Sequence, residues 1–247
     1  MPARGLLYVS AGLLSLADLR RMSNRAWAES SGGPDPLTGH SPSEARLYHR
    51  VVRPGDRICV VGCGSGRDLR PFLGGDHDVV GVEPSPEPAA ALRRILRDTQ
   101  QTAQVIEGFI EDVALPGAFD VFIFSFSCYS YIPGSARRIA MLRRLQDHVR
   151  PGARVVLSYV RRFGNWGGTA VRLAAFAARI ARTDLQWEQH DVVVRANAGP
   201  EPALGFTHCF VPTELELEVE QAGYSVREHG DDPWTSPFVV ITSTLTR

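Results

Sequence analysis

Residues 60–68 read VVGCGSGRD and decide the fold. Apolar residues lead into a turn in which every second residue is a glycine, and a charged pair follows where a helix would begin. A second apolar segment, residues 79–82, ends at Glu83, whose carboxylate can accept hydrogen bonds from both hydroxyls of a ribose. Glycine suits the turn because it adopts backbone conformations closed to other residues and lets a ligand approach closely. The layout predicts a nucleoside-binding α/β unit.

The glycine spacing distinguishes two classes of nucleoside-binding fold. Dinucleotide-binding folds have the pattern G-x-G-x-x-G, but here the glycines fall at 62, 64 and 66, and Arg67 occupies the position of the expected third glycine. The G-x-G-x-G turn and the acidic residue after the next strand resemble the first two motifs of class I S-adenosylmethionine-dependent methyltransferases. Two alternatives stay open here: a nicotinamide enzyme, and a glycine turn that only joins a strand to a helix.

Apolar and amphipathic segments alternate from about residue 42 onward. Ser41 and Glu44 have the spacing of a capping box, and Thr213 with Glu216 repeats it. Strands are expected near residue 60 and at 79–83, 105–106, 119–126, 153–159, 191–195, 225–229 and 238–244. Helices are expected at 42–52, 67–73, 87–98, 135–149 and 166–182, and from 213 to the glycine at 223. The alternation predicts a doubly wound, mostly parallel α/β sheet. By resemblance, it is a seven-stranded Rossmann-like methyltransferase fold with an antiparallel strand from a C-terminal hairpin.

Two segments lie outside this pattern. Residues 1–40 are expected to form an N-terminal helical extension, because the leucines and arginines of 11–28 have helical spacing. The extension covers either an edge of the core or the ligand pocket, and both interpretations stay open. Residues 41–247 are expected to form the methyltransferase domain. Within it, residues 161–206 match no known pattern and, by resemblance, form a lid-like insertion that shapes the substrate pocket.

By resemblance, the cofactor is S-adenosyl-L-methionine, bound at the carboxyl ends of the strands. The residues expected to bind it are Gly62, Cys63, Gly64, Gly66, Asp68, Glu83, Phe109, Ile110, Ser125 and Phe126. Two positions depart from the family pattern. Val60 stands where an acidic residue often helps to hold the amino group of the cofactor, and Phe109 stands where an acidic side chain often contacts adenine. Asp68 is a candidate substitute for the missing acid.

Three residues are candidates for the methyl-transfer step, which needs alignment, exclusion of water and, for some acceptors, removal of a proton. Tyr129 and Tyr131 follow the fourth strand of the nucleoside-binding unit, and aromatic faces suit a sulfonium charge; ordinary packing is their alternative role. His208 is the candidate general base because an unperturbed histidine titrates near neutral pH; its alternative role is that of a buried structural histidine. No metal-ligand spacing is visible, so no metal site is predicted.

Composition limits the partners. Acidic and basic residues balance at 27 each, which gives no general affinity for nucleic acid or an anionic membrane. Every basic residue is an arginine, as expected of a GC-rich bacterial genome. Four scattered cysteines and the lack of an apolar span of about 20 residues predict a reduced, cytoplasmic protein without a membrane segment. The apolar segment 6–16 leaves a homodimer open.

One function is favoured over two others. The leading hypothesis is S-adenosylmethionine-dependent methyl transfer to oxygen or nitrogen of a small molecule of secondary metabolism. No Asn-Pro-Pro-Tyr-like tetrapeptide follows the segment 119–126, which argues against methylation of DNA bases or glutamine. The alternatives are a non-catalytic, cofactor-binding or degenerate module of the same fold, motivated by Val60 and Phe109, and a nicotinamide-dependent oxidoreductase.

Overall fold

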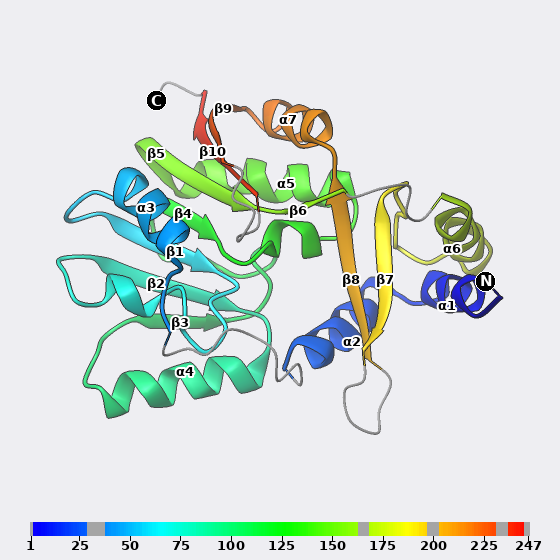
Figure 1. The fold of residues 1–247 in the computed structure, drawn as a ribbon, viewed down its shortest axis with the longest axis horizontal. Coiled ribbons are helices and arrows are strands. Elements are labelled where there is room, and N and C mark those ends of the chain that lie inside the picture. Colours follow the sequence, from blue (N-terminus) through cyan, green and yellow to red (C-terminus); the bar gives the residue numbers. More distant parts are fainter. Residues whose placement is uncertain (1, 29–37, 163–167, 197–202, 231–236, 245–247) are drawn as a thin grey trace.

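The computed structural model describes residues 2–28, 38–162, 168–196, 203–230 and 237–244. The chain is arranged in two parts (Figure 1). The first, called the Rossmann unit below, comprises the large sheet and its helices between α3 and β5 and from α7 to β10. The second, called the cap, comprises α1, α2, β6, α6, β7 and β8. The cap therefore takes its elements from two separate segments of the sequence.

The Rossmann unit is built on a seven-stranded sheet with the order β3-β2-β1-β4-β5-β10-β9. Its strands are β1 (Arg57–Val61), β2 (Asp78–Glu83), β3 (Gln104–Glu107), β4 (Phe119–Phe124), β5 (Val149–Ser158), β9 (Tyr224–Gly230) and β10 (Phe238–Ser243). β1 to β5 are parallel, and β10 lies antiparallel between β5 and β9. The predicted doubly wound sheet with an antiparallel C-terminal strand is confirmed. Its strand order reverses between β1 and β4, the place where such sheets bind ligands.

Helices cover both faces of the sheet. They are α3 (Pro42–Val51), α4 (Pro86–Asp98), α5 (Ser135–Leu145) and α7 (Pro212–Gln221). Leu47 of α3 and Leu92 of α4 belong to one buried cluster, whereas Leu142 of α5 and Leu215 of α7 belong to a second cluster. The strands between these clusters are buried on both sides, which explains the uninterrupted apolar sequence of β4.

The two predicted capping boxes have different outcomes. The hydroxyl oxygen of Ser41 accepts the N–H of Glu44, and the carboxylate of Glu44 accepts the N–H of Ser41, so the capping box of α3 is confirmed. At α7 the N-cap residue is Val211, which makes no side-chain cap, and the capping box predicted at Thr213 is wrong. α7 begins instead at Pro212, because proline has a helical φ and no N–H to satisfy in the first turn.

Two predicted helices are shorter than expected. The segment after the glycine turn, predicted as a helix over 67–73, has only a 3₁₀ turn at Arg70–Phe72. The helix predicted over 135–149 ends at Leu145 and a 3₁₀ turn follows. Val149 already pairs with Phe119 in the sheet, so strand pairing, rather than the proline and glycine that follow, ends the helical region.

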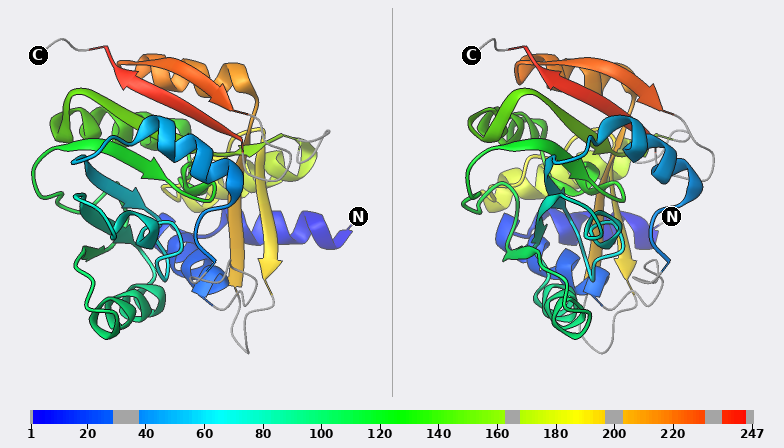
Figure 2. Two further views of the ribbon diagram at one scale, coloured as in Figure 1. Left: turned by 60° about the vertical axis from the view of Figure 1, so that its left-hand side comes forward. Right: turned by 90° about the vertical axis from the view of Figure 1, so that its left-hand side faces the viewer.

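The cap joins the N-terminal helices to the insertion. Its elements are α1 (Pro2–Gly12), α2 (Leu16–Ala28), β6 (Val160–Arg161), α6 (Gly168–Ala181), β7 (Asp191–Ala196) and β8 (Ala203–Phe210). β8 pairs with β6 on one side and with β7 on the other. Tyr8 and Leu19 from the N-terminal helices share one buried cluster with Val171, Ala174 and Phe206 from the insertion. Figure 2 shows α1 beside this second group of elements.

The cap also differs in detail from the sequence expectations. The single helix predicted over 11–28 is two helices, α1 and α2, separated by a turn at 13–15. Residues 203–210, not predicted as a strand, form β8. The start of the helix predicted over 166–182 and residues 29–37 of the predicted N-terminal extension lie outside the described residues. None of the described helices is both long and apolar enough to span a bilayer.

Candidate active site

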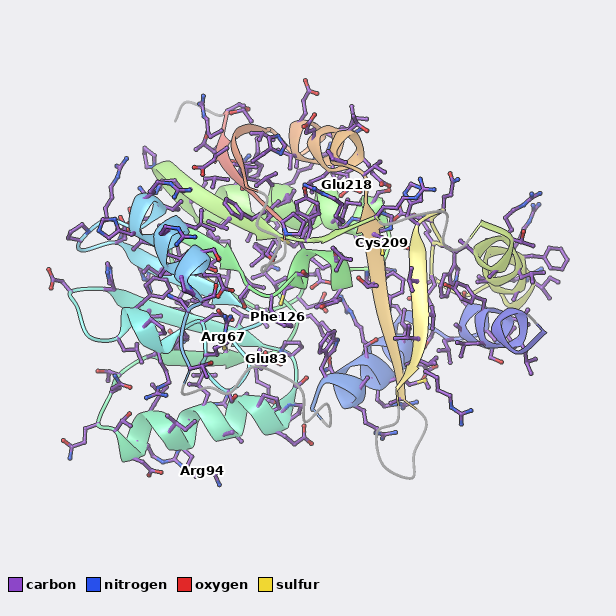
Figure 3. The ribbon with its side chains drawn as sticks, in the orientation of Figure 1. Arg67, Glu83, Arg94, Phe126, Cys209 and Glu218 are labelled. Carbon is purple, nitrogen blue, oxygen red and sulfur yellow. The ribbon has the colours of Figure 1, made fainter. Side chains whose placement is uncertain are left out.

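A cavity of about 550 Å³ lies between the carboxyl ends of the strands and the cap. On the side of the Rossmann unit it is lined by the glycine turn and by the segments that follow β2, β3 and β4. On the cap side it is lined by Leu19, Arg20, Ser23, Asn24, Trp27 and Phe206. Figure 3 labels Arg67, Glu83 and Phe126, which come from three different segments, at this edge of the sheet. The cavity therefore needs both parts of the chain.

The three glycines of the turn have different tasks. Gly62, Gly64 and Gly66 all have positive φ, at 69°, 52° and 105°, a region that favours glycine. A Cβ on Gly62 would lie 2.1 Å from the sulfur of Cys128, and one on Gly66 would lie 2.6 Å from Leu92. A Cβ on Gly64 would meet no atom within 4 Å. Gly64 thus leaves space for a ligand, whereas the other two glycines allow close packing.

Glu83 is held firmly against the glycine turn. Its Oε2 accepts the N–H of Gly64 at 2.8 Å, and its Oε1 accepts the N–H of Ser85 at 2.9 Å. Burial raises the pKa of Glu83, and these two hydrogen bonds, together with one from the Ser85 side chain, oppose that rise. A carboxylate can accept about four hydrogen bonds, so these three do not exhaust it. The carboxylate is therefore oriented toward the turn, with capacity left to accept hydroxyl groups of a ribose.

One end of the cavity is closed by a contact between the cap and the segment after β3. The guanidinium of Arg20 lies 4.3 Å from the ring centre of Phe109. The same guanidinium pairs with Glu111 and Asp112, each at 2.7 Å. Ile110 also lines this end. The two acids that follow Phe109 are thus engaged by the cap, and the ring of Phe109 offers an apolar face to a ligand.

The other end of the cavity is aromatic and contains a strained turn. Phe126 and Ser127 follow β4 with φ values of 45° and 64°, which non-glycine residues adopt rarely. This conformation leaves the side chain of Phe126 46% exposed at the cavity. Tyr131 also lines the cavity, and its ring centre lies 4.7 Å from that of Trp27.

Most, but not all, of the predicted site residues line the cavity. Among the predicted cofactor residues, the exceptions are Gly66, which shapes the turn, and Ser125, whose hydroxyl donates to the backbone oxygen of Gly62 at 3.0 Å. Among the three candidates for the methyl-transfer step, only Tyr131 lines it. Tyr129 is fully buried, and its hydroxyl donates to Glu218 at 2.9 Å.

His208 lies away from the cavity, in a buried network of charges. Its Nδ1 is 2.7 Å from Asp191 and its Nε2 is 3.2 Å from Glu214. Burial disfavours a charged imidazole, but these two carboxylates outweigh burial and raise the pKa of His208 to about 9. His208 is fully buried, so it cannot reach an acceptor in the cavity. We assign it a structural role, which was its alternative from the sequence.

The same network contains the groups of potential metal ligands that are found among the described residues. Ligand atoms of His190, His208 and Glu214 lie within 4.8 Å of one another. The two oxygens of Glu214 already contact His190 and His208, at 3.3 Å and 3.2 Å. Hydrogen bonds and ion pairs therefore account for this arrangement without a metal ion.

Sequence reasoning missed the cap residues of the site. Arg20, Asn24 and Trp27 all face the cavity from α2, and Asn24 donates to the backbone oxygen of Pro84 at 3.0 Å. Their spacing of three and four residues is that of one helix face. The spacing shows from the sequence that these residues share one face of a helix, but it does not show which surface that face contacts.

Comparison with known proteins agrees with this geometry. Residues 60–155 match a family model described as a methyltransferase domain. This segment carries the glycine turn and Glu83, so the part of the chain that lines the Rossmann side of the cavity is similar to methyltransferase domains. A ubiquinone biosynthesis O-methyltransferase of Xanthomonas campestris is 28% identical to this chain over 166 residues, 64% of this chain and 66% of the relative. The chain thus covers just under two thirds of that relative.

Solved structures of methyltransferases share the fold of this chain. The CcbJ methyltransferase of Streptomyces caelestis has a TM-score of 0.65 at 17% identity, covering 91% of this chain and 98% of the other. CalS10, an amino pentose methyltransferase of Micromonospora echinaspora with S-adenosylmethionine bound, has a TM-score of 0.60 at 20% identity, covering 84% and 93%. Both cover residues beyond the matched domain, so the similarity in fold extends to parts of the cap.

The residues present fit S-adenosylmethionine, the ligand bound in the CalS10 structure. Gly64 leaves open space beside the turn, and Glu83 presents free carboxylate lone pairs next to it. Phe109 and Ile110 supply an apolar surface at one end of the same cavity, suited to stacking with an aromatic base. The nicotinamide alternative from the sequence has no support in these comparisons.

Proposed function

We propose that this protein transfers a methyl group from S-adenosylmethionine to an oxygen or nitrogen atom of a small, secondary-metabolite acceptor. The observation that carries the proposal is the contact between Glu83 and Gly64, because it combines a ribose acceptor with an open glycine turn in one cavity. When bound, S-adenosylmethionine would supply an electrophilic methyl group and would leave as a neutral thioether. A neutral acceptor would release its proton to water, and an already ionised acceptor would release none.

The residues of the chain act by orientation and by exclusion of water. Glu83 fixes the nucleoside by hydrogen bonds and Phe109 by stacking, so alignment comes from groups that are already rigid. Phe126 and Tyr131 offer aromatic faces to a cationic sulfur. Trp27 and Phe206 of the cap cover the cavity from the opposite side. A cavity closed by the cap supports a small acceptor rather than a macromolecule.

The aromatic end of the cavity supports a reaction without a protein base. Burial raises the pKa of the Tyr131 hydroxyl and of the Cys128 thiol, so both stay neutral and do not accept a proton at pH 7. His208 does not reach the cavity. An acceptor that is nucleophilic by itself, such as a neutral amine or an ionised hydroxyl, suits this end of the cavity. Relatives named as a glycopeptide N-methyltransferase, a sugar N-methyltransferase and an O-methyltransferase support both choices.

Two measurements test the proposal. Calorimetric titration with S-adenosylhomocysteine should give binding to the wild type, and Glu83→Gln should weaken it by about tenfold or more, because hydrogen bonds to a charged group are lost. Glu87→Gln is the matched control, since Glu87 borders the same cavity but is exposed. Transfer of radiolabelled methyl groups into extracts of small molecules should give a labelled product. Binding without any labelled product would favour the non-catalytic module, and the absence of binding would refute the proposal.

A further inference from the structure

Aromatic side chains at one end of the cavity leave much of their surface uncovered. This end, called the acceptor end below, is lined by Trp27 of the cap and by Phe126, Cys128 and Tyr131 after β4. Trp27 is 41% exposed and Phe126 is 46% exposed. The ring centres of Trp27 and Tyr131 lie 4.7 Å apart, and their planes are tilted by 46°. Ligand cavities are typically lined by such aromatic surfaces, so we expect a ligand to cover these rings.

Cys128 separates the aromatic rings from the carboxylates beside the glycine turn, which is called the cofactor end. Burial raises the pKa of the Cys128 thiol, and the nearby charges of Glu83 and Asp68 raise it further. Burial and the Cys128 thiol raise the pKa of the Tyr131 hydroxyl, but no carboxylate among the described residues contributes to that rise. Within the described part of the chain, a ligand next to Tyr131 therefore has no carboxylate beside it to balance a positive charge.

A protonated aliphatic amine fits the acceptor end poorly for two reasons of charge. An ammonium group without a counter-charge is costly to bury. A bound sulfonium cofactor would also place a second positive charge nearby, and like charges repel. The aromatic faces attract cations, but the sulfonium would already use this attraction.

Proton transfer gives a third reason. Aliphatic amines with a pKa near that of lysine, about 10.4, are almost entirely protonated at pH 7, and an ammonium nitrogen has no lone pair with which to attack a methyl group. The Tyr131 hydroxyl and the Cys128 thiol are both neutral at this pH, so neither removes the proton. The acceptor end thus favours a nucleophile that is already free of its extra proton.

We propose that the acceptor is a flat aromatic compound with an amine or an acidic hydroxyl on its ring, and that Trp27 and Tyr131 are the residues that select it. Aromatic rings stack on one another more favourably than their buried area alone accounts for. An arylamine is neutral at pH 7 and an acidic phenol is ionised, so each has a lone pair available without a protein base. This inference rests on the proposed function and names the class of its acceptor.

The transfer to such an acceptor is balanced without a further reactant. The lone pair on nitrogen or oxygen forms the new bond to the methyl carbon, and the electron pair of the broken bond stays on sulfur. A methylated arylamine then releases one proton to water, whereas a phenolate has no proton to release.

Four compounds with six-membered rings separate ring shape from charge in an experiment. Aniline and phenol are flat and uncharged at pH 7, cyclohexanol is puckered and uncharged, and cyclohexylamine is puckered and positively charged. The affinity of each for the protein saturated with S-adenosylhomocysteine is measured by ligand-observed NMR. Calorimetric titration of S-adenosylhomocysteine itself reports whether the cofactor end of each variant is intact.

The wild type should bind phenol and aniline about threefold more tightly than cyclohexanol, or better, and cyclohexylamine should bind most weakly. Trp27→Leu and Tyr131→Leu should each abolish most of the preference for phenol over cyclohexanol, because leucine keeps an apolar side chain but removes the ring. Phe176→Leu is the matched control, since Phe176 is 62% exposed on α6 and does not line the cavity. The affinity for S-adenosylhomocysteine should stay within about twofold in all three variants.

Three results would overturn the inference. Cyclohexylamine that binds as tightly as aniline would show that the acceptor end accepts an ammonium group. Equal affinities of the wild type for phenol and cyclohexanol, or no binding of either, would show that it does not select flat rings. A preference that both substitutions leave unchanged would show that Trp27 and Tyr131 do not cause it. Each of these results leaves the proposed function standing as long as the wild type binds S-adenosylhomocysteine, and absence of that binding would refute the proposed function itself.

Discussion

The Rossmann unit and the cap position their site residues by different means. In the Rossmann unit, Glu83 and Gly64 are fixed by the register of parallel strands, because Val61 pairs with Val82 and the turn follows directly. In the cap, Phe206 depends on side-chain packing between helices and strands from distant parts of the sequence, and Trp27 is carried by α2, whose Leu19 packs in the same cluster as Phe206. Backbone hydrogen bonds of the sheet hold the cofactor end of the cavity rigidly, whereas side-chain packing of the cap determines the shape of the acceptor end. Substitutions at the acceptor end are therefore expected to leave the cofactor end undisturbed.

The two parts meet in a buried group of charges. Arg138 of α5 is fully buried and pairs with Glu218 of α7 at 2.6 Å and with Glu188, next to the cap, at 2.7 Å. Glu188 in turn lies 3.5 Å from His208 of β8. These ion pairs connect the Rossmann unit to the cap, so their removal tests how far the two parts depend on each other.

The largest effect is expected for Arg138→Met. Loss of the guanidinium leaves the buried carboxylate of Glu218 without its charge partner, and breaking such a pair costs about 3–5 kcal/mol. The free energy of unfolding, measured in urea, should fall by that amount. The double variant Arg138→Met/Glu218→Leu should recover part of the loss, because the fully buried pair is removed as a whole and only the partly exposed Glu188 loses its partner. A double variant as unstable as the single one would contradict this explanation.

The next effect is expected for Leu19→Ala in the cap. Leu19 is 1% exposed and belongs to the cap cluster, and a Leu→Ala change in such a position costs about 3 kcal/mol. Hydrogen exchange should speed up in α1, α2 and β8, while the strands β1 and β4 keep their protection. Ile123→Ala in β4 is the control, since it should reduce protection throughout the Rossmann unit. Uniform loss of protection in Leu19→Ala would show that the cap is not an independent unit.

A moderate effect is expected when the pH is raised. The folded-state pKa of His208 is about 9, above the ordinary value of 6.5. Its contribution to stability is therefore complete below pH 6.5 and is lost as the pH rises through about 9. Thermal unfolding temperatures measured from pH 6 to about pH 9.5 should fall across this window. His208→Gln should remove this part of the pH dependence, and an unchanged slope in that variant would contradict the assignment.

The smallest effect is expected for Arg20→Gln. The pairs of Arg20 with Glu111 and Asp112 are partly exposed, and such pairs contribute about 1 kcal/mol or less. Because Arg20 closes the Phe109 end of the cavity, S-adenosylhomocysteine should dissociate several-fold faster in stopped-flow measurements. Arg21→Gln is the control, since Arg21 is an exposed residue of the same helix and pairs only with Asp18 among the described ion pairs. Equal dissociation rates in both variants would mean that this closure has no role.

The Rossmann unit could be predicted from the sequence because its signals are local. Short patterns of a few residues determine the local structure at three places: the turn at 62–66, the apolar strand β4 and the capping box at Ser41. The capping box at Thr213 failed because a proline at 212 sets the start of that helix first. Local patterns are informative where neighbouring residues decide the outcome, and they mislead where a second local signal competes.

The cap and the surroundings of His208 could not be predicted for a physical reason. Residues 203–210 were not expected to form a strand, yet β8 pairs Asp191 opposite His208 across the ladder. Directly opposed residues of two strands point to the same face, so the imidazole meets a carboxylate 17 positions away in the sequence. Similarly, Tyr8 packs with Val171 only after the chain has folded. The periodicity of a single segment cannot predict contacts between residues that are distant in the sequence.

The division of the cap between two segments has a consequence for synthesis on the ribosome. α1 and α2 leave the exit tunnel before the strands of the large sheet, but Tyr8 and Leu19 find their apolar partners only after α6, β7 and β8 have been translated. The strands β1 to β4 emerge in the meantime and can assemble as translation proceeds. Nascent chains of this protein are therefore expected to expose the apolar side of α1 and α2 until β8 has been made, so the acceptor end of the cavity is completed after the cofactor end.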